Sequence, residues 1–282
     1  MHNKSLAMTV GVEAALGNPL NYLDNAIKKY GDIKTFFSKY KNPVGIELEI
    51  ENVPTSCRRA LTEEGLYWKW VEDHSLKVNG AEFVSCPLSG QNIDYAIYEV
   101  SKYLDNAAEL LQYSVRTSTH VHMNVSFMNF DEFCSLIALS AYLEPLLYTM
   151  CEDHRKGNPY CYPLTLMSPT DVMMFHDELK YCGINTAPVR RQLTVEYRQL
   201  HGTNNWKLLR RWIQVLCKIY YFAKTTPNKE VFGSLHEVIR SKNHENLVKR
   251  ILGATAVLFP NLTMCNDNLL WVLAYMEHTE NM

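Results

Sequence analysis

Carboxylate side chains recur at every second position near the end of residues 44–51 of this 282-residue chain. The segment reads Val-Gly-Ile-Glu-Leu-Glu-Ile-Glu, and such strict alternation is typical of a β-strand with one buried face. Successive side chains of a strand point to opposite faces, so Glu47, Glu49 and Glu51 are expected on one face. Three neighbouring carboxylates repel one another unless water solvates them or a cation neutralises them. The pattern alone leaves both explanations open.

Two histidines occupy the polar face of a second alternating segment, residues 119–127. His120, His122, Asn124 and Ser126 point one way, and the residues between them point the other. An imidazole can bind a metal ion or a phosphate through one ring nitrogen, so two histidines at positions i and i+2 suit either ligand. Histidines that are only hydrogen-bonded or exposed fit the same pattern equally well.

A third segment, residues 193–200, places Thr194, Glu196 and Arg198 on one face. Glu196 beside Arg198 fits an ordinary ion pair, which contributes little when exposed. It fits equally well a metal ligand next to an arginine that binds phosphoryl oxygens through its planar guanidinium.

Glu82 lies in a fourth segment, residues 80–85, and its role is ambiguous when taken alone. Together, the four segments place Glu, His or Arg on their polar faces in otherwise apolar sequence. Carboxylate oxygens combined with a few imidazoles and an arginine suit a Mg²⁺ or Mn²⁺ ion that holds a nucleotide. The combination is therefore far more informative than any single segment.

The elements that position these residues are predicted to form an α+β fold with an antiparallel sheet. Because the strands alternate apolar and polar residues, we expect one face of the sheet to pack on helices and the other to stay open. Strands are predicted at residues 44–51, 66–72, 81–85, 119–127 and 193–200. Helices are predicted at residues 93–113, 131–152 with a bend at Pro145, 205–224, and within 230–282. Residues 151–188 are expected to form an irregular loop region over the site.

Composition limits the class of protein. Hydrophobic residues make up 47% and charged residues 21%, as in ordinary soluble domains, and the net charge of −2 argues against nucleic acid as the main partner. Eight cysteines form no Cys-x-x-Cys pair and the N-terminus lacks a secretory signal, so reduced thiols in a cytoplasmic protein are expected. The longest apolar run, residues 136–150, is short for a membrane span, and no membrane association is expected.

Two parts of the chain differ in character. Residues 1–42 are polar and rich in Asn and Lys, and they are predicted to form an N-terminal helical appendage with a helix over residues 19–40. Residues 43–282 are predicted to form one domain with a helical C-terminal part.

The polar segments, taken in order, resemble the amidoligases. The motifs are Gly-x-Glu-x-Glu at 45–49, Asp-x-Ser-Leu…Gly-x-Glu-Phe-Val-Ser at 73–85, His-Val-His-Met-Asn-Val at 120–125 and Val-Glu-Tyr-Arg-x-x-x-Gly-Thr at 195–203. This family belongs to the carboxylate–amine ligases, which include glutamine synthetase and glutamate–cysteine ligase, and the resemblance covers about residues 43–205. It implies a glutamine synthetase-type curved antiparallel sheet, with helices on one face and the active site on the other. Thr117, Ser118 and Thr119 depart from the family pattern, which usually has glycines just before the His-x-His.

The resemblance also implies roles for individual residues. Glu47 and Glu49 would each serve a different Mg²⁺ (or Mn²⁺) ion, with Glu82 as a further metal ligand and His120 and Glu196 completing a site. His122 and Arg198 would contact the phosphates of ATP, with Asn124 and Asp73 as secondary candidates. Arg198 and Glu49 would be catalytic, Arg198 by stabilising the transferred γ-phosphoryl group. Glu51 matches no motif position and is expected to be solvated.

The activity implied is ATP-dependent amide formation between a carboxylate and an amine, through an acyl phosphate. The substrates would be amino acids, peptides or proteins, and an oligomer is possible. Two alternatives stay open: a phosphotransferase or ATPase with the same metal site, and a non-catalytic binding or virion-associated module that keeps the fold. Arg190 and Arg191 fit a substrate carboxylate site or a solvated loop equally well. Tyr160, Tyr162 and His176 are candidates for the acceptor pocket by position alone.

Overall fold

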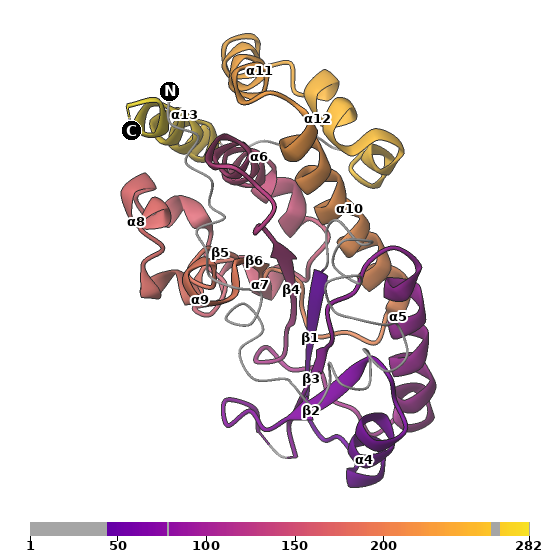
Figure 1. Ribbon diagram of the computed structural model, residues 1–282. Coiled ribbons are helices and arrows are strands. Elements are labelled where there is room, and N and C mark those ends of the chain that lie inside the picture. The colour runs from indigo at the N-terminus through magenta and orange to yellow at the C-terminus, as the bar shows by residue number, and fades with distance from the viewer. Residues whose placement is uncertain (1–43, 78, 261–265, 282) are drawn as a thin grey trace.

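Six antiparallel strands form the centre of the molecule, in the spatial order β2-β3-β1-β4-β6-β5 (Figure 1). The computed structural model describes residues 44–77, 79–260 and 266–281. The strands are β1 (Val44–Ile50), β2 (Trp68–Val71), β3 (Ala81–Ser85), β4 (Thr119–Asn124), β5 (Ile184–Asn185) and β6 (Thr194–Tyr197). Every neighbouring pair is antiparallel. The predicted α+β class and antiparallel sheet are therefore confirmed.

Helices account for most of the remaining described chain. The longer ones are α4 (Thr55–Glu63), α5 (Gln91–Leu104), α6 (Phe130–Tyr148), α10 (Trp206–Thr225), α11 (Asn228–Ser241), α12 (Glu245–Leu252) and α13 (Asn266–Glu280). Helix α6 packs against α10, α11 and α13, and almost all of its residues are buried. A helix that is apolar on every side needs partners on every side, so α6 organises the helical part of the molecule.

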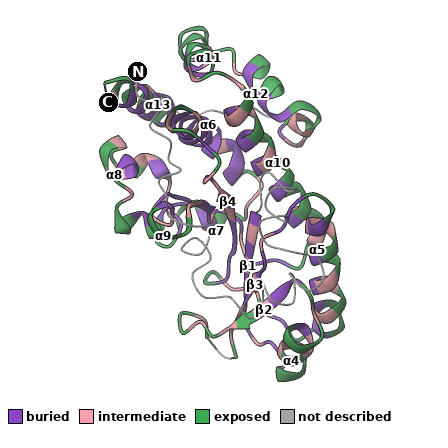
Figure 2. Cartoon of the chain, in the orientation of Figure 1, coloured by how far each residue is buried: buried purple, intermediate pink, exposed green. Residues whose placement is uncertain are grey.

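The apolar faces of the strands join this helical part in one core. Ile46 and Leu48 of β1, Val121 of β4 and Val195 of β6 are at most 1% exposed. They belong to the same cluster of buried residues as the inward-facing side of α5 and α10 (Figure 2). Since apolar and polar residues alternate along the strands, this core fixes the opposite face as the one that carries the charged side chains.

Helix α6 begins with a complete capping box. The side chain of Asn129 accepts a hydrogen bond from the Glu132 backbone N–H at 2.9 Å, and the Glu132 carboxylate accepts one from the Asn129 N–H at 3.0 Å. The two side chains thereby satisfy backbone donors that no helical carbonyl can reach. Pro145 lies inside the last turn, and the helix continues past it to Tyr148.

The irregular region between residues 151 and 188 contains several short elements. They are α7 (Asp153–Lys156), η2 (Leu164–Leu166), α8 (Pro169–Met173) and η3 (Asp177–Tyr181), followed by the edge strand β5. After β5 comes the short helix α9 (Val189–Gln192). The prediction of a loop region over this whole range was too coarse, because one-turn helices and a two-residue strand carry no periodicity.

Several boundaries differ from those predicted. Helix α5 ends at Leu104 and passes through η1 (Asp105–Ala107), well before residue 113, because the chain then turns so that Gln112 pairs with Glu51. Helix α4 was not predicted at all. Strand β6 begins at Thr194, since Leu193 has a left-handed backbone with φ 53°. The predicted N-terminal appendage, with its helix over 19–40, lies outside the described residues.

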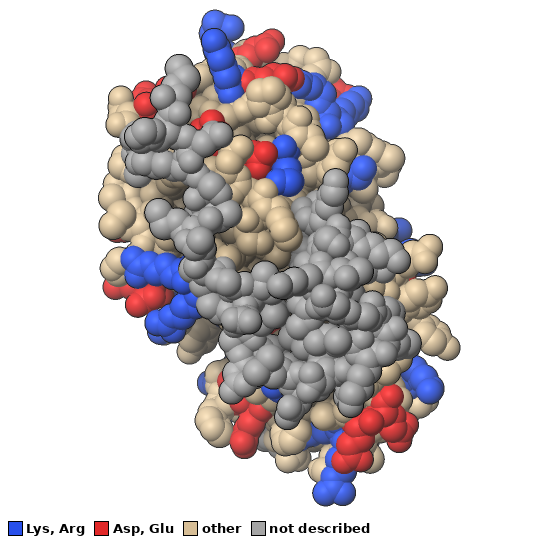
Figure 3. All heavy atoms as spheres, viewed as in Figure 1, with Lys and Arg blue, Asp and Glu red and all other residues tan. Residues whose placement is uncertain are grey.

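Acidic and basic side chains are interspersed around the visible face of the molecule in Figure 3. Among the described helices, none combines the length and the apolar character that crossing a membrane requires. The charged residues of the inner strands, in contrast, gather on the polar face of the sheet.

Candidate active site

Strand pairing brings the polar residues of distant segments into one row across the sheet. Glu49 of β1 lies opposite Glu82 of β3, and Glu47 lies opposite His120 of β4. His122 of β4 in turn lies opposite Glu196 of β6. Residues as far apart in sequence as 47 and 196 therefore share one small region.

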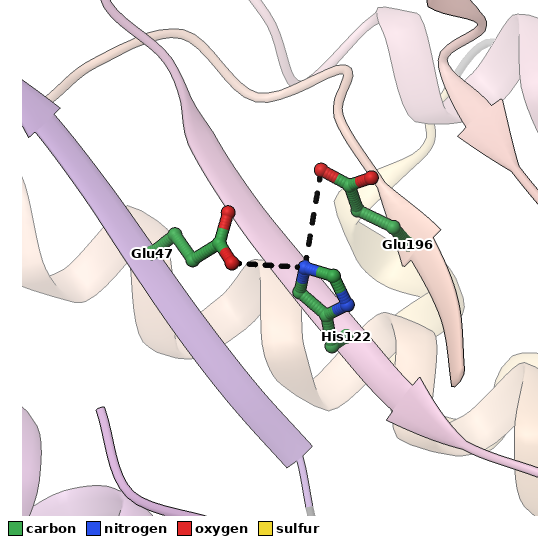
Figure 4. A group of neighbouring side chains, drawn as sticks. All are labelled: Glu47, His122 and Glu196. Carbon is green, nitrogen blue, oxygen red and sulfur yellow. Dashed lines mark ion pairs between the residues drawn. The ribbon is translucent and has the colours of Figure 1, made fainter. Parts of the chain in front are cut away.

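Three side chains of this row form a group with the geometry of a metal site. One ligand atom each from Glu47, His122 and Glu196 lies within 4.8 Å of the others (Figure 4). The three come from the adjacent strands β1, β4 and β6, and their side chains point toward one another on one face of the sheet. Two carboxylate oxygens with one imidazole form a donor set that Mg²⁺ and Mn²⁺ accept. We refer to this group as the Glu47–His122–Glu196 triad.

The orientation of His122 supports a ligand role for its Nε2 atom. Nδ1 lies 3.0 Å from Thr194 Oγ1, while Nε2 lies 3.1 Å from Glu47 Oε1 and 3.9 Å from Glu196 Oε1. Nε2 is buried and makes no aligned hydrogen bond with any described residue. A histidine whose other nitrogen is tied to a hydroxyl and whose Nε2 faces two carboxylates is arranged as metal-ligating histidines are.

Glu196 is held from two further sides. Its Oε2 accepts a hydrogen bond from Asn185 Nδ2 at 2.6 Å, and its Oε1 accepts one from Arg198 Nη1, also at 2.6 Å. Glu196 is 4% exposed, so these protein partners, and not water, fix the position of its carboxylate.

His120 occupies a different environment from His122. Its Nδ1 lies 3.1 Å from Glu47 Oε2 and 3.2 Å from Glu196 Oε1, and its Nε2 lies 2.7 Å from the hydroxyl of Ser118. Both ring nitrogens are therefore engaged by protein atoms. His120 sits between the triad and the part of the sheet that carries Glu49.

The charged side chains of the site are largely buried, so little water screens the electrostatic interactions between them. Burial raises the pKa of Glu47, but the charges and hydrogen bonds of His122 and His120 outweigh burial and hold the pKa well below its usual value. Burial also opposes ionisation of Glu196, whose pKa is nevertheless lowered by Arg198 and the two histidines. Burial lowers the pKa of His122, whereas the carboxylates of Glu47 and Glu196 outweigh it and raise the pKa to about 9.

Glu82 is the exception among these carboxylates. Burial, together with the negative charges of Glu47 and Glu49, raises its pKa to about 8. Glu82 thus lies among the negative charges of Glu47, Glu49, Asp73 and Glu196. A divalent cation near Glu49 and Glu82 would offset these charges.

Arg198 reaches the triad from the end of β6. Besides its bond to Glu196, its Nε is buried and has no hydrogen-bond partner among the described residues. Burial lowers the pKa of Arg198, but the charges of Glu196 and Glu49 outweigh burial and raise the pKa, so the guanidinium stays charged. Its backbone carbonyl accepts a hydrogen bond at 2.5 Å from Nη2 of Arg155, which is itself 2% exposed. Arg198 is therefore a positively charged side chain held in place beside the triad, and its Nε–H has no acceptor among the described residues.

Some predicted residues lie away from this centre. The Asn124 side chain accepts the Ser126 N–H at 2.8 Å at the end of β4, and Asp73 binds the backbone and hydroxyl of Ser75 in the loop before β3. Glu51 was expected to be solvated, and that expectation is wrong. It is 5% exposed, because the loop before β3 covers it and the Lys77 N–H donates to its carboxylate at 2.8 Å.

The loop candidates for substrate contacts have structural partners of their own. Arg190 is exposed on α9 and donates to the Met174 carbonyl, and Arg191 is exposed beside it. The Tyr162 hydroxyl donates to the Glu178 carbonyl, and His176 caps η3. Tyr160 is 53% exposed and packs against Tyr181. No contact of these residues with the triad is found within the described chain.

Comparison with known proteins supports the resemblance found in the motifs. Residues 54–168 match the family model described as "Putative amidoligase enzyme". This part of the chain matches the amidoligase family. The matched range includes Glu82, His120, His122 and Asn124, whereas β1 and β6 lie outside it. The pairing of β4 with β1 and β6 brings Glu47 and Glu196 next to the histidines of the matched range. No curated protein matches the chain.

Four residues that support the site were given no role in it from the sequence. They are Ser118, Asn185, Thr194 and Arg155. Alternation along the strands places Thr194 on the polar face, and Ser118 stands two residues before His120, so both carried a signal. Asn185 belongs to a two-residue strand and Arg155 to a one-turn helix, and no sequence pattern marks either of them.

Proposed function

We propose that this chain is an ATP-dependent carboxylate–amine ligase with a glutamine synthetase-type arrangement of its sheet. The observation that carries the proposal is the Glu47–His122–Glu196 triad with Arg198 beside it, in a chain whose residues 54–168 match the amidoligase family. Each of these features alone fits other activities. Their combination fits an enzyme that binds and transfers a phosphoryl group.

The donor set supports two positions for Mg²⁺ or Mn²⁺. The triad would hold one ion, with Nε2 of His122, which lies 3.1 Å from Glu47 Oε1, as its nitrogen ligand in the place that the resemblance gave to His120. Glu49 and Glu82, which face each other across β1 and β3, would hold a second. The bound ions would supply positive charge that offsets the charge on the phosphoryl oxygens of ATP.

Arg198 would bind the transferred γ-phosphoryl group. Its Nη1 is anchored on Glu196 at 2.6 Å, and its Nε has no described partner and is free to donate to a phosphoryl oxygen. A planar guanidinium offers donors in a fixed geometry, so anchoring one nitrogen fixes the direction of the others. This is electrostatic stabilisation prepared in advance of the reaction.

The proposed chemistry proceeds in two steps. A carboxylate oxygen of the first substrate attacks the γ-phosphorus of ATP, the bond to the β-phosphate oxygen breaks, and ADP leaves. The amine nitrogen of the second substrate then attacks the acyl phosphate, loses a proton and displaces inorganic phosphate, which leaves an amide. No serine or cysteine nucleophile is needed. The substrates would be an amino acid, a peptide or a protein carrying these groups.

The test is ADP release by the purified protein with Mg²⁺–ATP and pools of amino acids, amines and peptides. Mass spectrometry on each active pool should reveal a product lighter by one water than its two precursors combined. E196Q should abolish ADP release, whereas E63Q, at an exposed position of α4, should leave it unchanged. ADP without a joined product would indicate a phosphotransferase or ATPase. Absence of ATP binding would favour a non-catalytic module.

A further inference from the structure

Ser118 lies where three segments meet: β1, the start of β4 and the chain after β6. The proposed reaction gives it no role. It stands just before β4, and its carbonyl accepts the backbone N–H of Glu49 at 3.0 Å. It also forms an isolated bridge with His201, beyond the end of β6. Next to it, the Gly202 N–H donates to the Thr117 carbonyl at 3.0 Å, and a Cβ at Gly202 would clash with the Thr117 side chain. The backbone of Ser118 is therefore held on both sides.

The hydroxyl of Ser118 connects two site residues. It donates to Glu49 Oε2 at 2.5 Å and lies 2.7 Å from His120 Nε2. Because a hydroxyl has one proton and two lone pairs, donation to Glu49 leaves its oxygen to accept from the imidazole. Ser118 is 3% exposed, so water does not compete for these contacts.

This contact orients Glu49. Glu49 is 9% exposed, and the Ser118 hydroxyl is a donor that holds its carboxylate. His120 Nε2 lies farther away, at 3.8 Å. With Ser118 as its partner through Oε2, Glu49 keeps its other oxygen for a ligand. Loss of the hydroxyl would leave a buried carboxylate free to turn.

Thr194 makes the equivalent contact in the other half of the site. Its hydroxyl lies 3.0 Å from Nδ1 of His122 and turns Nε2 toward Glu47 and Glu196. The two hydroxyls thus support different residues, Ser118 on the Glu49 side and Thr194 in the triad. The triad also has partners that Ser118 does not touch, since Asn185 and Arg198 hold Glu196.

We propose that Ser118 is a positioning residue for the cation site that contains Glu49, which it contacts directly, and that the triad, which Ser118 reaches through His120, depends on it far less. The proposal rests on the proposed function, because it takes Glu49 as a cation ligand. Loss of a group that hydrogen-bonds to a metal ligand typically lowers metal affinity about 10- to 100-fold. Loss of the Ser118 hydroxyl should therefore lower cation affinity mainly at the Glu49 site, by an amount large enough to measure.

The experiment is a Mn²⁺ titration of the full chain by isothermal calorimetry, with electron paramagnetic resonance to count free Mn²⁺. Wild type should show two classes of site, which E49Q and E196Q assign by removing one each. S118A should weaken the Glu49 class about 10- to 100-fold and leave the triad class within about threefold. T194V should give the reverse pattern. Circular dichroism spectra and melting curves check that each variant is folded.

The outcomes separate this proposal from the proposed function. Two classes in wild type, with S118A leaving both unchanged or weakening the triad class as much as the Glu49 class, would overturn the role of Ser118 alone. A single class that E49Q leaves intact would also overturn it while the triad stands. Absence of any Mn²⁺ binding to wild type would overturn both. If S118A failed to fold, T194V would still test the proposal. Equal weakening of the Glu49 class and the triad class by T194V would refute the idea that Ser118 and Thr194 support different cation sites.

Discussion

Glu49 and Glu82 face each other directly across the β1–β3 pair. Burial of Glu82, together with the negative charges of Glu47 and Glu49, raises the pKa of Glu82 to about 8. Two carboxylates at opposing positions of neighbouring strands repel each other unless a proton or a cation lies between them. In the metal-free protein the pair therefore keeps a proton up to about pH 8, and a bound cation would replace that proton.

The first prediction concerns E82Q. Replacing Glu82 with glutamine removes one of the two charges, so the metal-free variant should melt several degrees above wild type at about pH 8, given about 2–4 °C per kcal/mol for a chain of this size. Mn²⁺ should stabilise wild type by about 2.7 kcal/mol at a concentration 100 times its dissociation constant, and E82Q by clearly less. Differential scanning fluorimetry with and without EDTA measures both effects. E63Q, at an exposed position, is the control and should behave as wild type.

The opposite result for E82Q would be informative. A metal-free E82Q that melts below wild type would mean that Glu82 makes a stabilising contact that outweighs its repulsion from Glu49. Equal Mn²⁺ stabilisation of both proteins would place the second cation away from Glu82.

The second prediction concerns R198K. Lysine keeps the positive charge but loses the planar guanidinium, whose Nη1 binds Glu196 while Nε stays available. Arginines that stabilise a transferred phosphoryl group are worth about 10³–10⁵ in turnover, so kcat should fall by about a hundredfold or more. The Mn²⁺ affinity of the triad should fall much less than turnover does, because Asn185 still holds Glu196. Steady-state ADP release, combined with Mn²⁺ titration, separates the two effects. A loss of Mn²⁺ affinity equal to the loss of turnover would make Arg198 a support of the triad only.

Alternation of apolar and polar residues along the chain is sufficient to locate most of the strands that carry the candidate site. The strands carrying Glu47, Glu82, His122 and Glu196 were predicted with the correct side-chain faces, because a period of two is unambiguous over several residues. Their proximity followed only from the pairing order of the sheet, in which β1 lies between β3 and β4. No local pattern specifies that order.

Burial was the property that sequence predicted least well. Glu51 continues the alternation of Glu47 and Glu49, yet it is covered by the loop that follows β2. The difference between His120 and His122 also comes from tertiary contacts, since Ser118 engages one ring and Thr194 the other. Alternation assigns a side chain to a face, but the loops that cross that face decide its partners.

The third prediction tests the start of α6. N129A removes the side chain that accepts the Glu132 N–H, and loss of an N-cap of this type typically costs about 1 kcal/mol of stability. Because α6 is buried on all sides, we expect the loss to appear in global unfolding by urea. N129S keeps an oxygen at the cap and should recover most of the stability. Equal destabilisation by N129S and N129A would show that the cap hydrogen bond is not the cause.

The fourth prediction is a pH dependence that arises from Glu144 in α6. This carboxyl is 1% exposed, and burial raises its pKa to about 8, although the Leu164 N–H at 3.0 Å partly offsets burial. A folded-state pKa above the unfolded value means that the native protein binds the extra proton. The stability contributed by the neutral group is then fully present below the unfolded pKa near 4.5 and lost as the pH rises through about 8. The free energy of unfolding should therefore fall between about pH 5.5 and about pH 8.5, by at most about 1.4 kcal/mol per pH unit for one proton.

E144Q, which cannot ionise, should lack this component, whereas E277Q at an exposed position of α13 should retain it. Urea unfolding at both pH values measures the difference, and identical pH slopes for E144Q and wild type would mean that Glu144 does not retain its proton in the folded protein.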